Sequence, residues 1–189
     1  MRHIHGFENE DELHIMIWYN VFITKNEKSE FGGVHGVALE HFLKFHEGEF
    51  LSETEIADFE KAFNLKLPEG MKCLYRKQNG GYLKKCGNSL FDLPLRVLYP
   101  IGKSFDSHVP TINRLLEEQK NDGFIPMKFL PFCSDKAGDD YYVRIDEEKY
   151  GTVYYLFSEF LDDFLEEPEN YIVANTFDEF MEMVDALEG

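Results

Sequence analysis

The sequence predicts an α+β fold in which a mostly antiparallel sheet is flanked by helices. Two helical segments lie within residues 52–78, short β-type segments follow, and a further helical segment comes last. The segments do not alternate regularly as strand, helix and strand, which argues against a parallel βαβ architecture. A chain of 189 residues has the length of one domain. We therefore expect residues 1–189 to form a single domain, with an extended N-terminal lead-in at 1–49 and a core at 50–187.

The lead-in contains two patterned segments. Residues 13–24 are rich in Ile, Val and aromatic residues, which favours a strand or a pair of strands. Residues 37–47 have the spacing of a short helix that Gly48 would end. Whether the lead-in adds a strand to the sheet or forms a separate binding surface stays open at this point.

The first helix of the core is predicted by its start signal. Residues 52–55, Ser-Glu-Thr-Glu, form a capping box, in which the Ser hydroxyl and the Glu carboxylate each accept a backbone N–H that would otherwise be unpaired. Ile56, Phe59 and Phe63 then share one face. Asn64 can end this helix.

The next helix is expected over residues 68–78, within LPEGMKCLYRKQNGG. Pro68 suits the first turn because its missing N–H would be unpaired there anyway. The inward face comprises Met71, Leu74, Tyr75 and Gln78. Asn79 or Gly80 can take the left-handed conformation that closes a helix, and the chain should then turn abruptly.

The rest of the core is predicted to contain most of the sheet. The expected strands lie within residues 82–101, with turns at 87–88 and 93–94, and at 128–133, 140–146 and 152–157. The last two should pair across the turn at 147–151. Two helices are also expected, one over 107–121 with Gly123 as its stop, and one that starts at the capping box Thr176–Glu179.

Composition points to a soluble cytoplasmic protein. The longest apolar run, residues 15–23, is about half the roughly 20 residues that a membrane span needs. The first residues, MRHIHGFENEDE, are acidic where a signal peptide would be apolar. Cys73, Cys86 and Cys133 show neither a metal-finger spacing nor a disulfide framework, which fits a reducing compartment.

Acidic residues are concentrated in the last third of the chain. The whole sequence has 19 basic and 36 acidic residues, a net charge of −17. Residues 132–189 hold 17 of the acids and only three bases, which accounts for −14 of that charge. Such a surface repels nucleic acid and anionic membranes and attracts basic partners. Acidity that only keeps the protein soluble is the alternative.

The sequence contains no recognisable motif for catalysis or cofactor binding. Six of the seven histidines lie in the first 46 residues, but His41 and His46 do not have the i, i+4 spacing of two metal ligands on one helix face. Residues 135–140 faintly resemble a calcium loop and lack its ligand pattern, so a turn is favoured. No phosphate-binding glycine loop or nucleophile elbow occurs. We expect no cofactor, no metal and no enzymatic activity; a hydrolase would need a pocket with converging polar groups.

Residues 158–169 combine apolar and acidic positions at helical spacing. Phe160, Leu161, Phe164 and Leu165 form the apolar set, and the segment carries six acids without a base. With Ser158 as cap and Pro168 as stop, the pattern predicts an acidic amphipathic helix of about two turns. It is either a solvated helix face or a negatively charged docking surface for a basic protein.

The segment SETEIADFEKAFNLKLPEGMKCLYRKQNGG resembles the start of the SUKH superfamily, which includes the yeast Smi/Knr-type regulators of cell-wall glucan synthesis. The matching residues are Glu55, Ile56, Phe59, Glu60, Leu67, Pro68, Asn79, Gly80 and Gly81. FLPFCSDKAGDDYYVRID, GTVYYL and VANTFDEFMEMV resemble later segments of the family, in the same order. The resemblance covers roughly residues 50–187.

The resemblance implies an α+β fold and a binding function. Bacterial members look like immunity proteins, which are cytoplasmic antidotes to polymorphic toxins, and fungal relatives are regulatory adaptors. We therefore predict a non-enzymatic immunity protein that binds a basic toxin, plausibly a nuclease, and binds no nucleic acid directly. A cell-wall regulatory adaptor is the alternative. The candidate contact residues are Asp139, Asp140, Asp162, Asp163, Glu166 and Glu167; the sequence does not give the oligomeric state.

Overall fold

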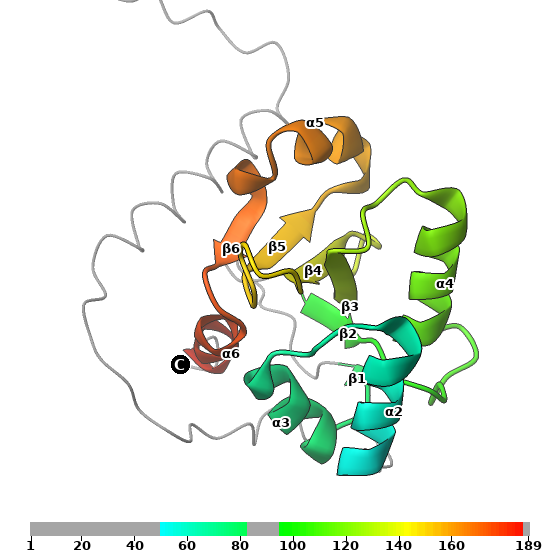
Figure 1. Cartoon of the computed structure of the whole chain (residues 1–189). Helices are drawn as coiled ribbons and strands as arrows, with labels where there is room; N and C mark the ends of the chain where they lie inside the picture. The colour runs from blue at the N-terminus through cyan, green and yellow to red at the C-terminus, as the bar shows by residue number, and fades with distance from the viewer. Residues whose placement is uncertain (1–49, 83–94, 187–189) are drawn as a thin grey trace, which may run out of the picture.

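Residues 50–82 and 95–186 are described by a computed structural model, shown in Figure 1. Their six strands form one sheet in the order β1 to β6, and every strand is antiparallel to its neighbours. This confirms the predicted α+β class and its antiparallel sheet. The strand expected at 13–24, the helix at 37–47 and the turns at 87–88 and 93–94 lie outside the described residues.

The described elements follow the predicted order. The strands are β1 (Gly81–Tyr82), β2 (Leu95–Leu98), β3 (Phe129–Asp135), β4 (Asp140–Arg144), β5 (Val153–Leu156) and β6 (Ile172–Ala174). The helices are α2 (Glu53–Phe63), α3 (Glu69–Lys77), α4 (Ile112–Asp122), α5 (Leu161–Glu166) and α6 (Phe177–Ala186). Two 3-10 turns, η2 (Ser158–Phe160) and η3 (Pro168–Tyr171), flank α5.

The start and the end of α2 are as predicted. The Ser52 hydroxyl accepts the backbone N–H of Glu55 at 3.2 Å, and the Glu55 carboxylate accepts the backbone N–H of Ser52 at 2.8 Å. Asn64 has a φ of 51° and ends the helix in the left-handed conformation. The capping box therefore satisfies backbone donors at one end while Asn64 turns the chain at the other.

The predicted stop of α3 is partly wrong. The four residues expected on its inward face are all buried: Met71, Leu74, Tyr75 and Gln78. The helix ends at Lys77, and the next residue, its C-cap Gln78, is extended rather than left-handed (φ −151°). Of the two candidate stops, Gly80 has a positive φ of 85° and lies beyond the cap, where it turns the chain into β1. The side chain of Asn79 instead forms hydrogen bonds with the backbone of Ile101, in the loop after β2.

Helix α4 begins later than predicted. The expected start was residue 107, whereas the helix runs from Ile112, with Thr111 as its N-cap accepting the N–H of Arg114 at 3.2 Å. Val109 is buried as predicted, but it lies in the loop that precedes the helix. The predicted stop at Gly123 is confirmed, with a φ of 70°.

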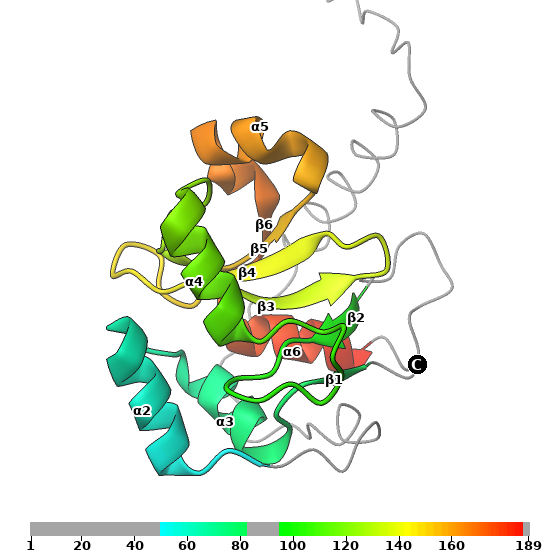
Figure 2. The same ribbon diagram turned by 90° about the vertical axis from the view of Figure 1, so that its right-hand side faces the viewer.

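The two faces of the sheet contact different helices. Neighbouring side chains along a strand point to opposite faces, so Tyr141 packs against Phe180 of α6 while Tyr142 packs against Phe164 of α5. The large core includes residues from α2, α3, α4 and α6, and a smaller core forms beneath α5. In Figure 1 the sheet lies between α4 and α6, and Figure 2 shows α5 at the end of the molecule opposite α2 and α3.

Candidate partner-binding surface

The acidic segment predicted as one helix is three short pieces. Residues 158–171 form η2, α5 and η3 in succession. Ser158 does not cap α5, because the residue before the helix is Phe160, which makes no side-chain cap. Pro168 does end α5, and it also begins η3. The segment therefore keeps the predicted amphipathic character, and the six residues of α5 make a little less than the two helical turns expected.

The smaller core holds this segment on the sheet. Phe164 is fully buried, and its ring centroid lies 4.9 Å from that of Phe129 in β3 and 5.4 Å from that of Tyr171 in η3. Leu161 is half-buried beside them, whereas Leu165 is 39% exposed. One aromatic side chain thus fixes a helix of six residues that would not be stable alone.

The acids of the segment face solvent. Glu159, Asp162, Asp163, Glu166 and Glu167 are all exposed. Within the described residues none of these five forms an ion pair. We name this set the α5 acidic surface. It contains four of the six predicted contact residues.

Asp139 lies next to this surface. It belongs to the turn between β3 and β4, and its Oδ1 accepts the backbone N–H of Ser158, at the start of η2, at 2.8 Å. The hydrogen bond brings together two acidic stretches that are 19 residues apart in the sequence. Asp139 is half-buried, so it supports the segment and is only partly available to a partner.

Asp140 is in a different environment from the other candidates. Its Oδ1 accepts the Tyr99 hydroxyl at 2.6 Å and its Oδ2 accepts the Tyr142 hydroxyl at 3.4 Å. Loss of solvation raises the pKa of this carboxyl to about 6, against the two hydrogen bonds, which lower it. The Asp140 carboxylate is therefore directed at tyrosine hydroxyls at the start of β4, and it is less available to a partner than the exposed acids of α5.

The stretch that faintly resembles a calcium loop is a turn closed by one carboxylate. Asp135 Oδ1 accepts the backbone N–H groups of Ala137, Gly138 and Asp139 at 2.7, 2.8 and 2.9 Å. Asp135 Oδ2 accepts the Tyr155 hydroxyl at 2.9 Å. Across the described part of the chain no group of three or more His, Cys, Asp or Glu side chains is arranged to hold a metal ion. The six N-terminal histidines lie outside that part.

The bases of residues 50–131 do not neutralise the acids of the last third. In the described ranges, Lys72, Arg76 and Arg114 pair only with acids of their own part of the chain. The acids of the last third that form ion pairs do so with Arg144 or Lys149. Within the described residues the acids of the last third are therefore not neutralised by the first two thirds, and five of the exposed ones lie at 159–167.

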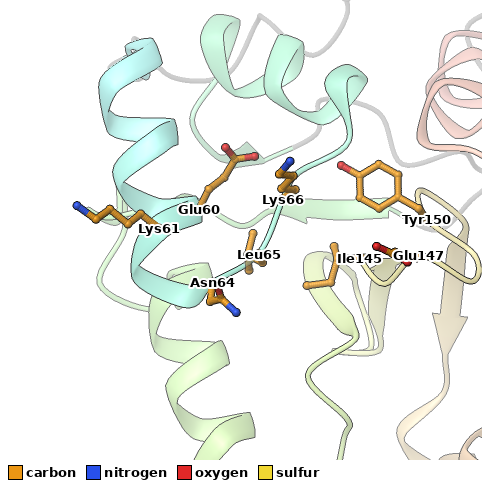
Figure 3. A pocket seen from close by; sticks show the side chains of 8 residues that line it. All are labelled: Glu60, Lys61, Asn64, Leu65, Lys66, Ile145, Glu147 and Tyr150. Atoms are coloured by element: carbon orange, nitrogen blue, oxygen red, sulfur yellow. The ribbon is translucent and has the colours of Figure 1, made fainter.

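A separate open groove of about 730 Å³ lies between the end of α2 and the β4–β5 turn. Figure 3 shows Leu65 and Lys66 on one side and Ile145, Glu147 and Tyr150 on the other. Sequence reasoning missed this groove, because its two sides are about 80 residues apart in the chain and neither carries a recognisable motif.

Comparison with known families agrees with this architecture. Residues 51–183 match the model of the SMI1 / KNR4 family (SUKH-1). The chain belongs to this family. A comparison with curated proteins finds no match. The SUKH match contains every described strand and all of α2 to α5, and it ends within α6.

The family match covers the sequence segments that resemble the SUKH superfamily. In this SUKH domain the Glu60 carboxylate accepts the backbone N–H of Leu67 at 2.8 Å, which joins the end of α2 to the Leu-Pro start of α3. None of the helices in the described residues is long and apolar enough to cross a membrane. The matched motifs therefore contribute to the fold, and a binding function has to be sought on the surface.

Proposed function

We propose that this SUKH protein is a cytoplasmic immunity protein that binds a cognate toxin and blocks it without catalysing a reaction. The observation that carries the proposal is the α5 acidic surface: five exposed carboxylates that have no ion-pair partner among the described residues. Solvent-exposed acids are common, but here they are held on a rigid sheet by a buried aromatic side chain. A pre-organised surface loses little entropy on binding.

The partner that fits this surface is a basic protein. Nucleases present cationic clefts to the phosphates of their substrate, so an acidic protein that fills such a cleft excludes the nucleic acid. Opposite charges also accelerate the encounter of the two proteins. The same negative charge disfavours direct contact between the SUKH protein and nucleic acid. The proposed contact centres on Asp162, Asp163, Glu166 and Glu167, with Asp139 beside them.

The experiment starts with the neighbouring reading frames, which on this proposal encode a large secreted protein with a toxin-like C-terminal domain. That domain should bind the SUKH protein in a pull-down, and its affinity should fall as salt is raised. In the test variant Asp162, Asp163, Glu166 and Glu167 are replaced by Lys, and we expect the affinity at low salt to drop at least tenfold.

A matched control separates this surface from net charge. It reverses four other exposed acids that form no ion pair in the described residues: Asp58, Glu117, Asp122 and Glu182. This variant should retain most of the affinity. Equal losses in both variants would reduce the role of α5 to bulk charge. Neighbouring frames without a toxin, together with binding to a cell-wall synthesis component, would favour the regulatory adaptor.

A further inference from the structure

The groove between α2 and the β4–β5 turn has two rigid walls. On the α2 side, Asn64 takes the left-handed conformation, and the backbone N–H of Leu65 donates to the Glu60 carbonyl at 3.0 Å. The Glu60 carboxylate then holds the N–H of Leu67. Lys66 lies between these two fixed points, so the position of its backbone is set before any ligand arrives.

The opposite wall, the β4–β5 turn, is held in place by the buried side chain of Arg144. The Arg144 side chain is 3% exposed and pairs with Asp146 through two contacts of 2.7 and 3.0 Å, and with Glu148. The backbone N–H of Gly151 returns to the Arg144 carbonyl at 2.8 Å and closes the turn. This arrangement leaves Glu147 and Tyr150 exposed at the edge of the groove.

The groove offers three kinds of contact. Leu65 and Ile145 are half-buried apolar side chains that pack on the large core and provide an apolar floor. Tyr150 is 44% exposed, and in Figure 3 its hydroxyl end is directed toward Lys66. Lys66 and Glu147 are exposed and, within the described residues, form no ion pair. Among the described residues, two unpaired charges of opposite sign, Lys66 and Glu147, thus lie on opposite walls of an apolar floor, whereas the Glu60 carboxylate already pairs with Lys72 at 3.4 Å.

This chemistry selects among ligands. Nucleic acid is disfavoured, because Lys61, the only other cation among the described residues that line the groove, extends away from it in Figure 3. Both Glu60 and Glu147 would also repel phosphates. The groove is open to solvent rather than enclosed, which suits side chains of another protein better than a buried small molecule. An extended peptide can place an apolar side chain on the floor with opposite charges on either side of it.

We infer that the groove is a second docking surface, which binds an extended peptide of a partner protein. In that peptide an apolar residue lies between an acidic residue, which pairs with Lys66, and a basic residue, which pairs with Glu147. Tyr150 covers the apolar residue and offers its hydroxyl to the peptide backbone. This surface is distinct from the α5 acidic surface and does not require that the partner be a toxin.

A peptide library tests the inference. Nonapeptides randomised at every position are displayed on beads and screened with the fluorescently labelled full-length chain. The expected result is a consensus with the order acidic, apolar, basic. A synthetic peptide with that consensus should bind at least tenfold more weakly to Tyr150→Ser, measured by fluorescence anisotropy.

Charge reversal gives the decisive comparison. Lys66→Glu should select a basic residue where the original chain selects an acidic one, and should leave the other positions of the consensus unchanged. Two control variants alter exposed residues outside the groove in the same way: Lys103→Glu and Phe124→Ser. Both should give the original consensus and affinity.

Three outcomes would overturn the inference: no consensus, an unchanged consensus with Lys66→Glu, or equal loss of affinity in the control variants. Thermal melts of every variant show whether the domain remains folded. Because both test residues are exposed, their substitution should leave the melting temperature within a few degrees of the original. These results are independent of the pull-down on the α5 acidic surface, so either proposal can fail alone.

Discussion

The side-chain amide of Asn79 is hydrogen-bonded to both backbone polar groups of Ile101. Its Nδ2 donates to the Ile101 carbonyl at 3.0 Å, and its Oδ1 accepts the Ile101 N–H at 2.8 Å. Both residues are buried. The amide therefore makes the two hydrogen bonds that a neighbouring strand would otherwise make to Ile101, in the loop after β2. Through these bonds Asn79, the first residue of the Asn-Gly-Gly sequence, connects the end of α3 to that loop.

We predict that Asn79→Ala strongly destabilises the domain. The substitution leaves the buried N–H of Ile101 without its partner, which costs about 1–3 kcal/mol. It also removes one of two hydrogen bonds to the Ile101 carbonyl, worth about 1 kcal/mol, because that carbonyl still accepts the N–H of Lys103 at 3.1 Å. The free energy of unfolding, measured by urea denaturation, should fall by about 2–4 kcal/mol. Asn113→Ala is the control, because Asn113 accepts the N–H of Gly102 at an exposed site where water can replace it. A loss in the control as large as in Asn79→Ala would contradict this explanation.

A second prediction concerns Gly80 and Gly102, which have nearly the same backbone conformation in different surroundings. Their φ values are 85° and 79°. A Cβ atom at Gly80 would lie 2.8 Å from Cβ of Pro100 and 2.9 Å from Cε1 of Phe105, whereas one at Gly102 would have no atom within 4 Å.

Gly102→Ala should therefore show only the cost of a left-handed non-glycine residue, about 1–2 kcal/mol. Gly80→Ala should show that cost and an overlap cost of about 1–3 kcal/mol in addition. Thermal and urea denaturation of the two variants give the difference directly. If both variants lose the same stability, the close packing of Pro100 and Phe105 is not what requires glycine at this position.

The predictions from sequence succeeded where the signal is local. The capping box of α2 lies within four residues, and its hydrogen bonds are those expected from Ser52 and Glu55. The start of α4 was misplaced because Val109 has the spacing of an inward helical residue. Apolar spacing indicates which residues are buried, not whether they are helical. Val109 is buried but lies in the loop before the helix, and the helix begins after its N-cap, Thr111.

Contacts between distant parts of the chain could not be read from the sequence. The hydrogen bond from Ser158 to Asp139 and the position of Asp140 among tyrosine hydroxyls depend on the register of β3, β4 and β5. Both acids looked equally available in the sequence. The structure separates them from the exposed acids of α5, because it shows which carboxylates already have partners.

A third prediction is a pH-dependent gain of stability in Asp140→Asn. In the unfolded chain an Asp carboxyl has its ordinary pKa, close to 4, whereas burial raises the pKa of Asp140 to about 6 in the folded protein. Between these values the folded protein binds more protons than the unfolded chain, so stability falls as pH rises through this window. Above pH 6 the charged carboxylate costs up to about 3 kcal/mol.

The amide introduced by Asp140→Asn would carry no charge and could still accept a hydrogen bond from Tyr99. The variant should therefore unfold at a higher temperature than the original chain at about pH 7.5, and the difference should shrink or disappear at about pH 4. Melting curves across this pH range measure the effect directly. A constant difference over the whole range would show that the ionisation of Asp140 is not responsible.

The last prediction concerns the attachment of the α5 acidic surface. Phe164 is fully buried against Phe129, whereas the adjacent Leu165 is 39% exposed. Phe164→Ala should lower the free energy of unfolding by about 3–5 kcal/mol through the cavity that it leaves. Leu165→Ala should cost much less, because its side chain contributes little buried area.

Hydrogen exchange locates the effect of these two substitutions. Because α5 has six residues and no side-chain cap, its amides depend on Phe164 for protection. In Phe164→Ala the amides of residues 158–171 should exchange faster than those of β3 and β4, and partner binding should weaken even though every acid is retained. If residues 158–171 keep their original protection in Phe164→Ala, the surface is held by contacts other than this ring, and the link between the smaller core and binding does not hold.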